Sequence, residues 1–153
     1  MMVPLNLPAY NPTIKNQNGV FYVFDPVRRK YIQLSPEEWV RQHLINYLAQ
    51  HLGYPIGLMQ VEKGLKYNNL IRRSDLLIYN ASNQSPLLLA ECKAPEVALT
   101  EAVVQQIASY NYTVKAPILL ITNGLQLICC SLQQGKLSML KQVPAYSELV
   151  KLY

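Results

Sequence analysis

Hydrophobic and polar residues follow patterns along the chain that predict both strands and helices. Two β-rich segments, residues 20–24 and 30–34, flank a turn that begins at Asp25-Pro26, which indicates a hairpin. The preceding residues 1–18 are rich in Pro and Asn, and they predict an irregular or extended N-terminal arm.

The first helix has a well-defined predicted start. Ser35 is a suitable N-cap, Pro36 suits the first helical position, and Glu38 stands where it can complete a capping box. Apolar residues then recur at helical spacing, so we expect the helix to reach about His51 and to stop at Gly53.

The rest of the chain alternates apolar runs with turns. These runs predict strands at 57–67, 75–79, 87–93, 117–122, 125–132 and 136–143, and helices at 100–114 and 145–152. The polar turn at 80–86 joins its two neighbouring strands into a hairpin in the middle of the sheet. This order predicts an α/β fold with a mixed central β-sheet flanked by helices.

Composition narrows the class of protein. A chain of 153 residues forms one domain of ordinary size, which we place at residues 19–153 after the arm. Half of the residues are hydrophobic and only 15% are charged, which excludes a disordered protein. The net charge of +5 permits a polyanionic partner such as nucleic acid.

Cysteine usage and the apolar runs indicate the compartment. Three cysteines without a Cys/His cluster suit free thiols in a reducing cytosol, and they exclude a disulfide framework and a zinc site. The N-terminus lacks the features of a signal peptide, and no apolar run is long enough to span a bilayer. We therefore expect a cytoplasmic protein without membrane association.

The candidate chemistry lies at the ends of two predicted strands. Asp75 opens one strand, and Glu91-Cys92-Lys93 closes the next, so that Glu91 and Lys93 project from the same face. If the strands form a hairpin, Asp75 lies near Glu91, and two adjacent carboxylates need a proton or a cation. Mg²⁺ suits this pair together with the main-chain carbonyl of Cys92. Such an ion activates water for attack on a phosphodiester, with Lys93 alongside to position or deprotonate it.

Structural explanations compete with this interpretation. Asp75 alone is typical of a strand or turn cap. Glu91 could instead form a salt bridge with Lys93 or with Arg72 or Arg73, because an apolar strand rarely carries an unpaired carboxylate.

An Asp followed by Glu-x-Lys at the end of the next strand is the signature of the PD-(D/E)XK nuclease superfamily. Together, five segments resemble the N-terminal nuclease domain of the type I restriction enzyme R protein: Glu38-Trp-Val-Arg41-Gln42, Asp75, Glu91-Cys-Lys-Ala-Pro95, Gln106-Ile-Ala-Ser-Tyr110-Asn111 and Thr122-Asn-Gly124. The match covers roughly residues 20–132. The resemblance implies a restriction-endonuclease-like fold and a Mg²⁺- or Mn²⁺-dependent endonuclease that hydrolyses DNA.

The resemblance also implies roles for individual residues. Asp75 and Glu91 would be metal ligands with the Cys92 carbonyl, Lys93 the catalytic lysine, and Glu38 a helix-borne acid that acts through water. Gln106 and Tyr110 match the family's QxxxY motif, which supports the active site and contacts the DNA backbone. Glu37 and Gln105 remain alternatives for Glu38 and Gln106, and Tyr110 is nearly as typical of a plain core aromatic.

Several expectations concern binding and partners. Arg72 and Arg73 precede Asp75, where they suit a phosphate-binding role beside Lys93. Ser74 replaces the Pro that usually stands before the family's Asp. No Walker A sequence is present, so we expect a stand-alone module. Its expected partners are DNA and other restriction-modification or motor subunits, and a homodimer is an alternative. Two rivals remain: a catalytically idle nucleic-acid-binding or partner-docking module, and a nuclease acting on RNA or on branched or damaged DNA.

Overall fold

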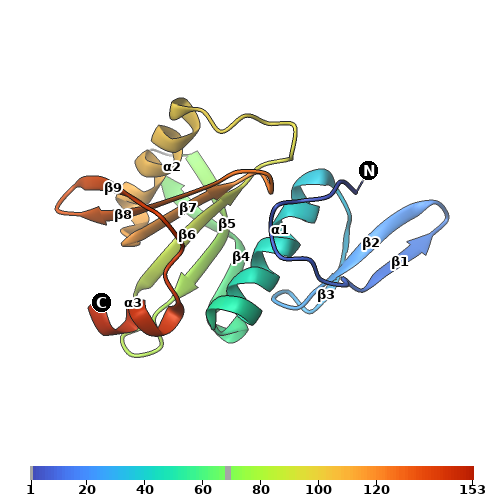
Figure 1. Cartoon of the computed structure of the whole chain (residues 1–153), viewed down its shortest axis with the longest axis horizontal. Coiled ribbons are helices and arrows are strands. Elements are labelled where there is room, and N and C mark those ends of the chain that lie inside the picture. Colours follow the sequence, from blue (N-terminus) through green and yellow to red (C-terminus); the bar gives the residue numbers. More distant parts are fainter. Residues whose placement is uncertain (1, 68–69) are drawn as a thin grey trace.

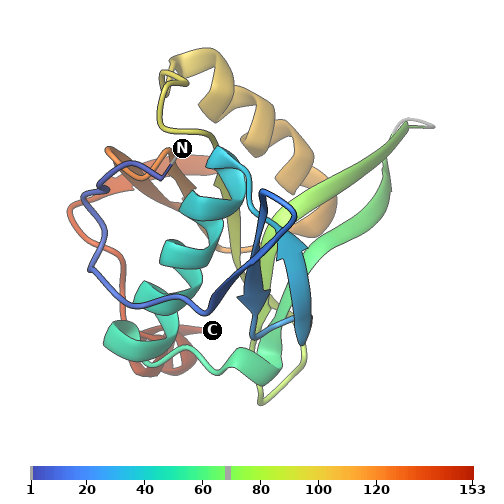
Figure 2. The same cartoon turned by 90° about the vertical axis from the view of Figure 1, so that its right-hand side faces the viewer.

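The computed structural model describes residues 2–67 and 70–153, and for residues 62–67 and 70–74 it describes the backbone alone. Within this part, the chain forms a three-stranded sheet, then helix α1 (Pro36–Asn46), and then a six-stranded sheet with helices α2 (Glu101–Val114) and α3 (Tyr146–Leu152). The three-stranded sheet lies at one end of the molecule, beyond α1 (Figure 1), and faces the viewer in Figure 2. No described helix has the length and apolar character that a membrane crossing requires.

The larger sheet is mixed, as the sequence predicts. Its strands lie in chain order: β4 (Met59–Tyr67), β5 (Leu70–Tyr79), β6 (Pro86–Cys92), β7 (Ile118–Thr122), β8 (Leu127–Gln133) and β9 (Lys136–Leu140). Only β6 and β7 pair in parallel among the described strands, and α2 makes the crossover that a parallel pair requires. The expected central hairpin is present, because β5 and β6 pair antiparallel through a turn at residues 80–85.

The two faces of this sheet carry separate apolar clusters. Leu88, Ala90 and Cys92 of β6 pack with α1 residues such as Val40 and Leu44 on one face. On the other face, the β5 and β6 leucines pack against α2 in a cluster formed by Leu77, Leu89, Ile107, Tyr110, Val114, Leu119 and Ile121. Since strand side chains alternate, every second residue of β6 faces α2. Glu91 therefore lies on the α2 side of β6.

The start of the chain is more regular than the sequence predicts. Residues 14–17, within the expected arm, form β1 (Ile14–Gln17), which pairs antiparallel with β2 (Val20–Asp25), and β2 pairs with β3 (Lys30–Gln33). The turn between β1 and β2 is Asn18-Gly19, and both residues have positive φ, 54° and 84°. Asn-Gly favours this backbone in a two-residue hairpin, so the missed strand had a local signal.

The first residues of the arm cross α1. The Trp39 indole donates a hydrogen bond to the Val3 carbonyl at 2.8 Å, and the main-chain N–H of Asn6 donates to the Gly124 carbonyl at 2.7 Å. Leu5 and Leu7 pack against the core cluster on this side. The arm thus covers the helix that carries two of the candidate acids.

The cap of α1 forms as expected in one half only. The Ser35 hydroxyl accepts a hydrogen bond from the main-chain N–H of Glu38 at 3.1 Å, but the Glu38 carboxylate bonds to two arginines and not to the cap. The expected single helix to residue 51 is also divided, because Tyr47–His51 forms a π-helical turn before Gly53, whose φ is +75°.

Candidate active site

The structure brings Asp75 and Glu91 together at the open ends of β5 and β6. Leu76 pairs with Ala90 in the antiparallel ladder, so the next positions, Asp75 and Glu91, lie opposite each other. Directly opposed residues share a face of the sheet, which is the arrangement that the sequence predicts for the two carboxylates.

Both oxygens of the Asp75 carboxylate accept hydrogen bonds. The Arg41 guanidinium donates through Nη2 to Oδ1 at 2.8 Å, and the main-chain N–H of Cys92 donates to Oδ2 at 2.7 Å. Asp75 is buried, and it therefore has a cationic partner from α1 and a neutral donor from β6. The sequence indicated no contact between Arg41 and Asp75.

Glu91 and Lys93 form an ion pair beside Asp75. The distance between Lys93 Nζ and Glu91 Oε1 is 3.3 Å, and both side chains are about three-quarters buried. Burial, and then the negative charge of Asp75, raise the pKa of Glu91 to about 8, although Lys93 acts in the opposite direction. The Glu91–Lys93 salt bridge, considered from the sequence as an alternative to a metal site, is therefore present together with the carboxylate pair. The effect of Lys93 on the pKa of Glu91 is smaller than the combined effect of burial and Asp75.

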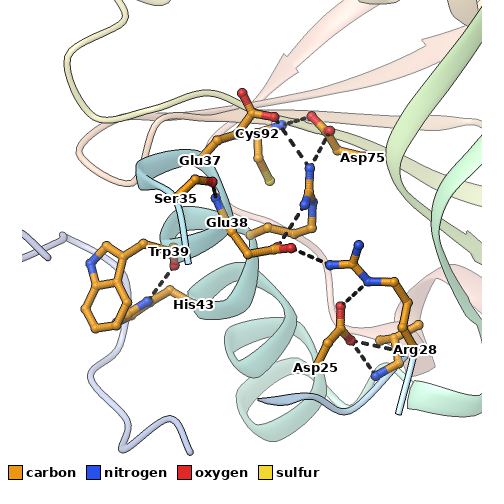
Figure 3. A network of polar contacts seen from close by, with 11 residues as sticks. Asp25, Arg28, Ser35, Glu37, Glu38, Trp39, His43, Asp75 and Cys92 are labelled. Carbon is orange, nitrogen blue, oxygen red and sulfur yellow. Dashed lines mark hydrogen bonds and ion pairs between the residues drawn. The ribbon is translucent and has the colours of Figure 1, made fainter. Parts of the chain in front are cut away.

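Arg41 separates Glu38 from Asp75, and these side chains belong to a row of alternating charges that continues to Arg28 (Figure 3). One of its carboxylate oxygens pairs with Arg28, and the other accepts from Arg41 at 2.8 Å. Arg28 in turn pairs with Asp25 at 2.6 Å. Glu38 reaches Asp75 only through Arg41, so its observed contacts hold arginines and leave no carboxylate oxygen without a cationic partner.

Glu37 is the acidic residue of α1 that remains partly open to solvent. Its side chain is 45% exposed, and one oxygen lies 3.5 Å from Arg41. Partial burial and the charge of Asp75 raise the pKa of Glu37, and Lys93 is among the groups that lower it. Glu37 thus lies near Asp75 (Figure 3), and of the two adjacent glutamates it is the one whose side chain is open to solvent.

The two residues of the QxxxY pattern have different environments. Gln106 is exposed, whereas Tyr110 is buried in the apolar cluster between α2 and the sheet. Tyr110 therefore has the surroundings of a core aromatic, while Gln106 lies on the helix that covers the Glu91 face. The side chains of Arg72 and Arg73 lie outside the described residues, although their backbone pairs with Leu65 and Gly64 in the β4–β5 ladder.

The donor set suits a hard cation better than a transition metal. Among the described residues, no group of three or more His, Cys, Asp or Glu side chains is placed to hold a metal ion. The Cys92 thiol is fully buried, and burial raises its pKa well above the ordinary value, so this sulfur is not a ligand. The Cys92 carbonyl points to the same strand edge as its N–H, which bonds to Asp75. Two carboxylates and one carbonyl at this edge fit Mg²⁺, which keeps several waters.

A mixed sheet with helices on both faces, and with Asp75, Glu91 and Lys93 at adjoining strand ends, is a restriction-endonuclease-like α/β fold. The family model described as Type I restriction enzyme R protein N terminus (HSDR_N) matches residues 36–144, and the chain belongs to this family. The resemblance to the N terminus of the type I restriction enzyme R protein is therefore confirmed.

A solved structure with the same fold belongs to a restriction enzyme subunit. It is a fragment assigned to the HsdR subunit of a type I restriction enzyme from Vibrio vulnificus YJ016, with 16% sequence identity and a TM-score of 0.60. The similarity covers 77% of the present chain but only 25% of that chain. A comparison with curated proteins gave no match.

Proposed function

We propose that the protein is a Mg²⁺- or Mn²⁺-dependent endonuclease that hydrolyses DNA phosphodiester bonds, as the nuclease part of a type I restriction R subunit. The observation that carries the proposal is the placement of Asp75 opposite Glu91, with the Lys93 amine 3.3 Å from the Glu91 carboxylate. Two acids and an amine at one strand edge are the groups that metal-dependent phosphodiester hydrolysis requires.

Asp75, Glu91 and the Cys92 carbonyl would hold the ion, and Glu37 would contact its waters from the α1 side. When bound, Mg²⁺ supplies an acidified water and neutralises charge on the phosphate in the transition state. Arg41 fixes Asp75 through the 2.8 Å ion pair, so that the carboxylate does not need to reorganise. A carboxylate oxygen has more than one lone pair, so Asp75 would bind an ion while it accepts the hydrogen bonds from Arg41 and Cys92.

Lys93 would act on the nucleophile and the phosphate. Its ammonium group is held by Glu91 yet remains partly exposed, so it can donate to a phosphate oxygen or orient a water at the same edge. Gln106, Arg72 and Arg73 would contact the DNA backbone. Binding of this kind is weakly dependent on sequence and strongly dependent on salt.

Nicking of supercoiled plasmid tests the proposal. The wild-type protein should nick in Mg²⁺ or Mn²⁺, and Lys93→Ala should lower the rate by about 100-fold or more, the usual contribution of an acid–base group. Lys136→Ala on the exposed edge strand β9 is the matched control and should retain the rate. Equal cleavage by wild type and Lys93→Ala would refute the assignment.

A second candidate is supported by the Asp75 ion pair. Because Arg41 already neutralises this carboxylate, the domain could be a catalytically idle module that binds nucleic acid or a partner subunit with the same fold. Calorimetric titration separates the two: saturable Mg²⁺ or Mn²⁺ binding that is lost in Glu91→Ala supports the nuclease, whereas no metal binding by the wild type supports the idle module.

A further inference from the structure

One face of the three-stranded sheet carries exposed aromatic side chains. Lys15 is paired with Tyr22, and Phe24 with Tyr31, so these four residues, here called the aromatic face, project from the same side. Phe24 and Tyr31 are 38% and 39% exposed, and their rings meet edge to face with centroids 5.5 Å apart. Ring surface that a fold leaves open on a sheet is available to a ligand.

The charge around the aromatic face is positive. Lys15 Nζ lies 4.1 Å from the centre of the Tyr31 ring and 5.9 Å from that of Tyr22. Arg29 and Lys30, in the turn and the first position of β3, are exposed. Asp25 is the only acidic residue in positions 1–36, and it is buried and paired with Arg28. Exposed cations without exposed carboxylates favour a polyanionic ligand over an ordinary protein partner.

The aromatic face adjoins a small cavity of about 210 Å³ between the arm, β2 and α1. Phe24 lines this cavity as well as the aromatic face. Gln42 is only 2% exposed and also lines it, and within the described part of the chain its side-chain Nε2 has no hydrogen-bond acceptor. Asn46 and Gln50 follow at four-residue intervals along the same side of the helical segment. An unpartnered buried amide donor is costly unless a ligand or water accepts from it.

We propose that the aromatic face and this cavity bind an unpaired stretch of nucleic acid, with bases stacked on Tyr22, Phe24 and Tyr31 and one base inserted beside Gln42. Aromatic rings with interleaved cations are the usual platform for single strands. The cavity is smaller than the roughly 300–1,000 Å³ that drug-sized ligands occupy, and this size favours a single planar ring system. Amide groups read the edges of such rings by hydrogen bonding.

The inference goes beyond the proposed cleavage and does not depend on it. The sheet is nevertheless joined to the candidate active site, because Arg28 in the β2–β3 turn pairs with Glu38, which in turn holds Arg41. A single strand of nucleic acid bound to the aromatic face would therefore lie on a sheet that contacts α1, the helix that carries Glu37 and Glu38. Binding measured in chelator separates this inference from any failure of the nuclease proposal.

The test is fluorescence anisotropy of the full chain with a labelled oligo-dT of about 16 nucleotides, and with a duplex of equal length, in EDTA. Wild type should prefer the single strand. Tyr31→Ala should weaken that binding by about 5- to 100-fold, the range expected for one lost stacking contact, while duplex binding changes less. Tyr112→Ala is the matched control, because this α2 tyrosine is 78% exposed and away from the aromatic face, and it should retain the affinity.

Two further variants address charge and the cavity. Lys15→Gln should reduce the dependence of log affinity on log salt by about 0.7, the contribution of one phosphate contact on a single strand. Gln42→Met, which preserves the side-chain volume, should reduce differences in affinity among oligo-dT, oligo-dA and oligo-dC. Thermal melting confirms that each variant is folded.

The inference is overturned if folded Tyr31→Ala binds the single strand as tightly as Tyr112→Ala does. It is equally overturned if wild type binds duplex and single strand alike, or if sedimentation shows that the aromatic face mediates self-association without binding DNA.

Discussion

Glu37 and Glu38 are adjacent glutamates in one helical turn, yet their surroundings predict opposite consequences of the same substitution. The Glu38 side chain is 4% exposed and lies between Arg28 and Arg41, whereas the Glu37 side chain is 45% exposed. Glu38→Gln keeps the size and one acceptor oxygen but removes the charge between two guanidinium groups. Glu37→Gln makes the same chemical change where water can replace what is lost.

The expected loss follows from burial. Removing one partner of a buried ion pair typically costs about 3–5 kcal/mol, because the remaining charge is left uncompensated. The amide oxygen introduced by Glu38→Gln still accepts one hydrogen bond, so we expect a cost at the lower end, about 3 kcal/mol. That is a large part of a total stability of roughly 5–15 kcal/mol, and it corresponds to a melting temperature lower by about 6–12 °C. Glu37→Gln should stay within about 0.5 kcal/mol of wild type.

Urea unfolding in EDTA, followed by circular dichroism, measures both variants without any contribution from bound metal. A double-mutant cycle with Arg28→Met should then give a coupling energy of about 1–3 kcal/mol between Arg28 and Glu38. The reasoning fails if Glu38→Gln and Glu37→Gln lose the same free energy of unfolding. It also fails if the cycle shows no coupling, since Glu38 would then not be a structural partner of Arg28.

Three further predictions concern Glu91 and α2. The folded protein raises the pKa of Glu91 to about 8, so between the ordinary pKa and about 8 the folded state holds a proton that the unfolded state has lost. The free energy of unfolding of the wild type should therefore fall relative to that of Glu91→Gln as the pH rises toward 8, by at most about 1.4 kcal/mol per pH unit. The same pH dependence of unfolding for the two proteins without metal would contradict this. Mg²⁺ must displace the same proton, so the affinity for Mg²⁺ should rise up to tenfold per pH unit below about 8 and then level off. Calorimetry in two buffers of different ionisation enthalpy should detect the released proton. A Mg²⁺ affinity that does not change with pH would exclude Glu91 as a ligand. Asn111→Ala should cost about 2–4 kcal/mol in chemical denaturation, because the buried Asn111 amide both donates to and accepts from Ala116 at 2.9 Å; a loss below about 1 kcal/mol would show that water replaces these bonds.

The elements were largely predictable because local signals agreed with burial. The Ser35 cap supplied a strong local preference at the start of a helix with a buried face, and the apolar runs of β5–β8 combined strand preference with burial. The strand at 14–17 was missed because its residues are mostly polar, and its only local signal was the Asn18-Gly19 turn. The π-helical turn at 47–51 leaves no periodic signature that separates it from an α-helix.

The candidate site was predictable as far as neighbouring strands determine it. Asp75, Glu91 and Lys93 follow from a hairpin register, which sequence patterns can indicate. The partners of Asp75 depend on tertiary packing, since Arg41 lies 34 positions earlier in the chain and reaches it only when α1 docks on the sheet. Arg28 likewise stands in a turn beside two other basic residues, a local sequence typical of solvated charge, yet it pairs with Asp25 and Glu38. Long-range ion pairs of this kind have no periodic signal.

The distribution of charge connects these observations. Five of the nine acidic residues of a chain with net charge +5 lie in this one region: Asp25, Glu37, Glu38, Asp75 and Glu91. Only three cations contact them among the described side chains, namely Arg28, Arg41 and Lys93. The buried end of the row, from Asp25 to Arg41, alternates in sign and balances itself, so the excess of carboxylates falls at Glu37, Asp75 and Glu91. Of these three, Asp75 is buried and shares Arg41 with Glu37 and Glu38, Glu37 is partly exposed, and Glu91 pairs with Lys93. A divalent ion would compensate this excess, and without one a proton on Glu91 would serve the same purpose, because burial and the charge of Asp75 raise the pKa of this carboxyl to about 8.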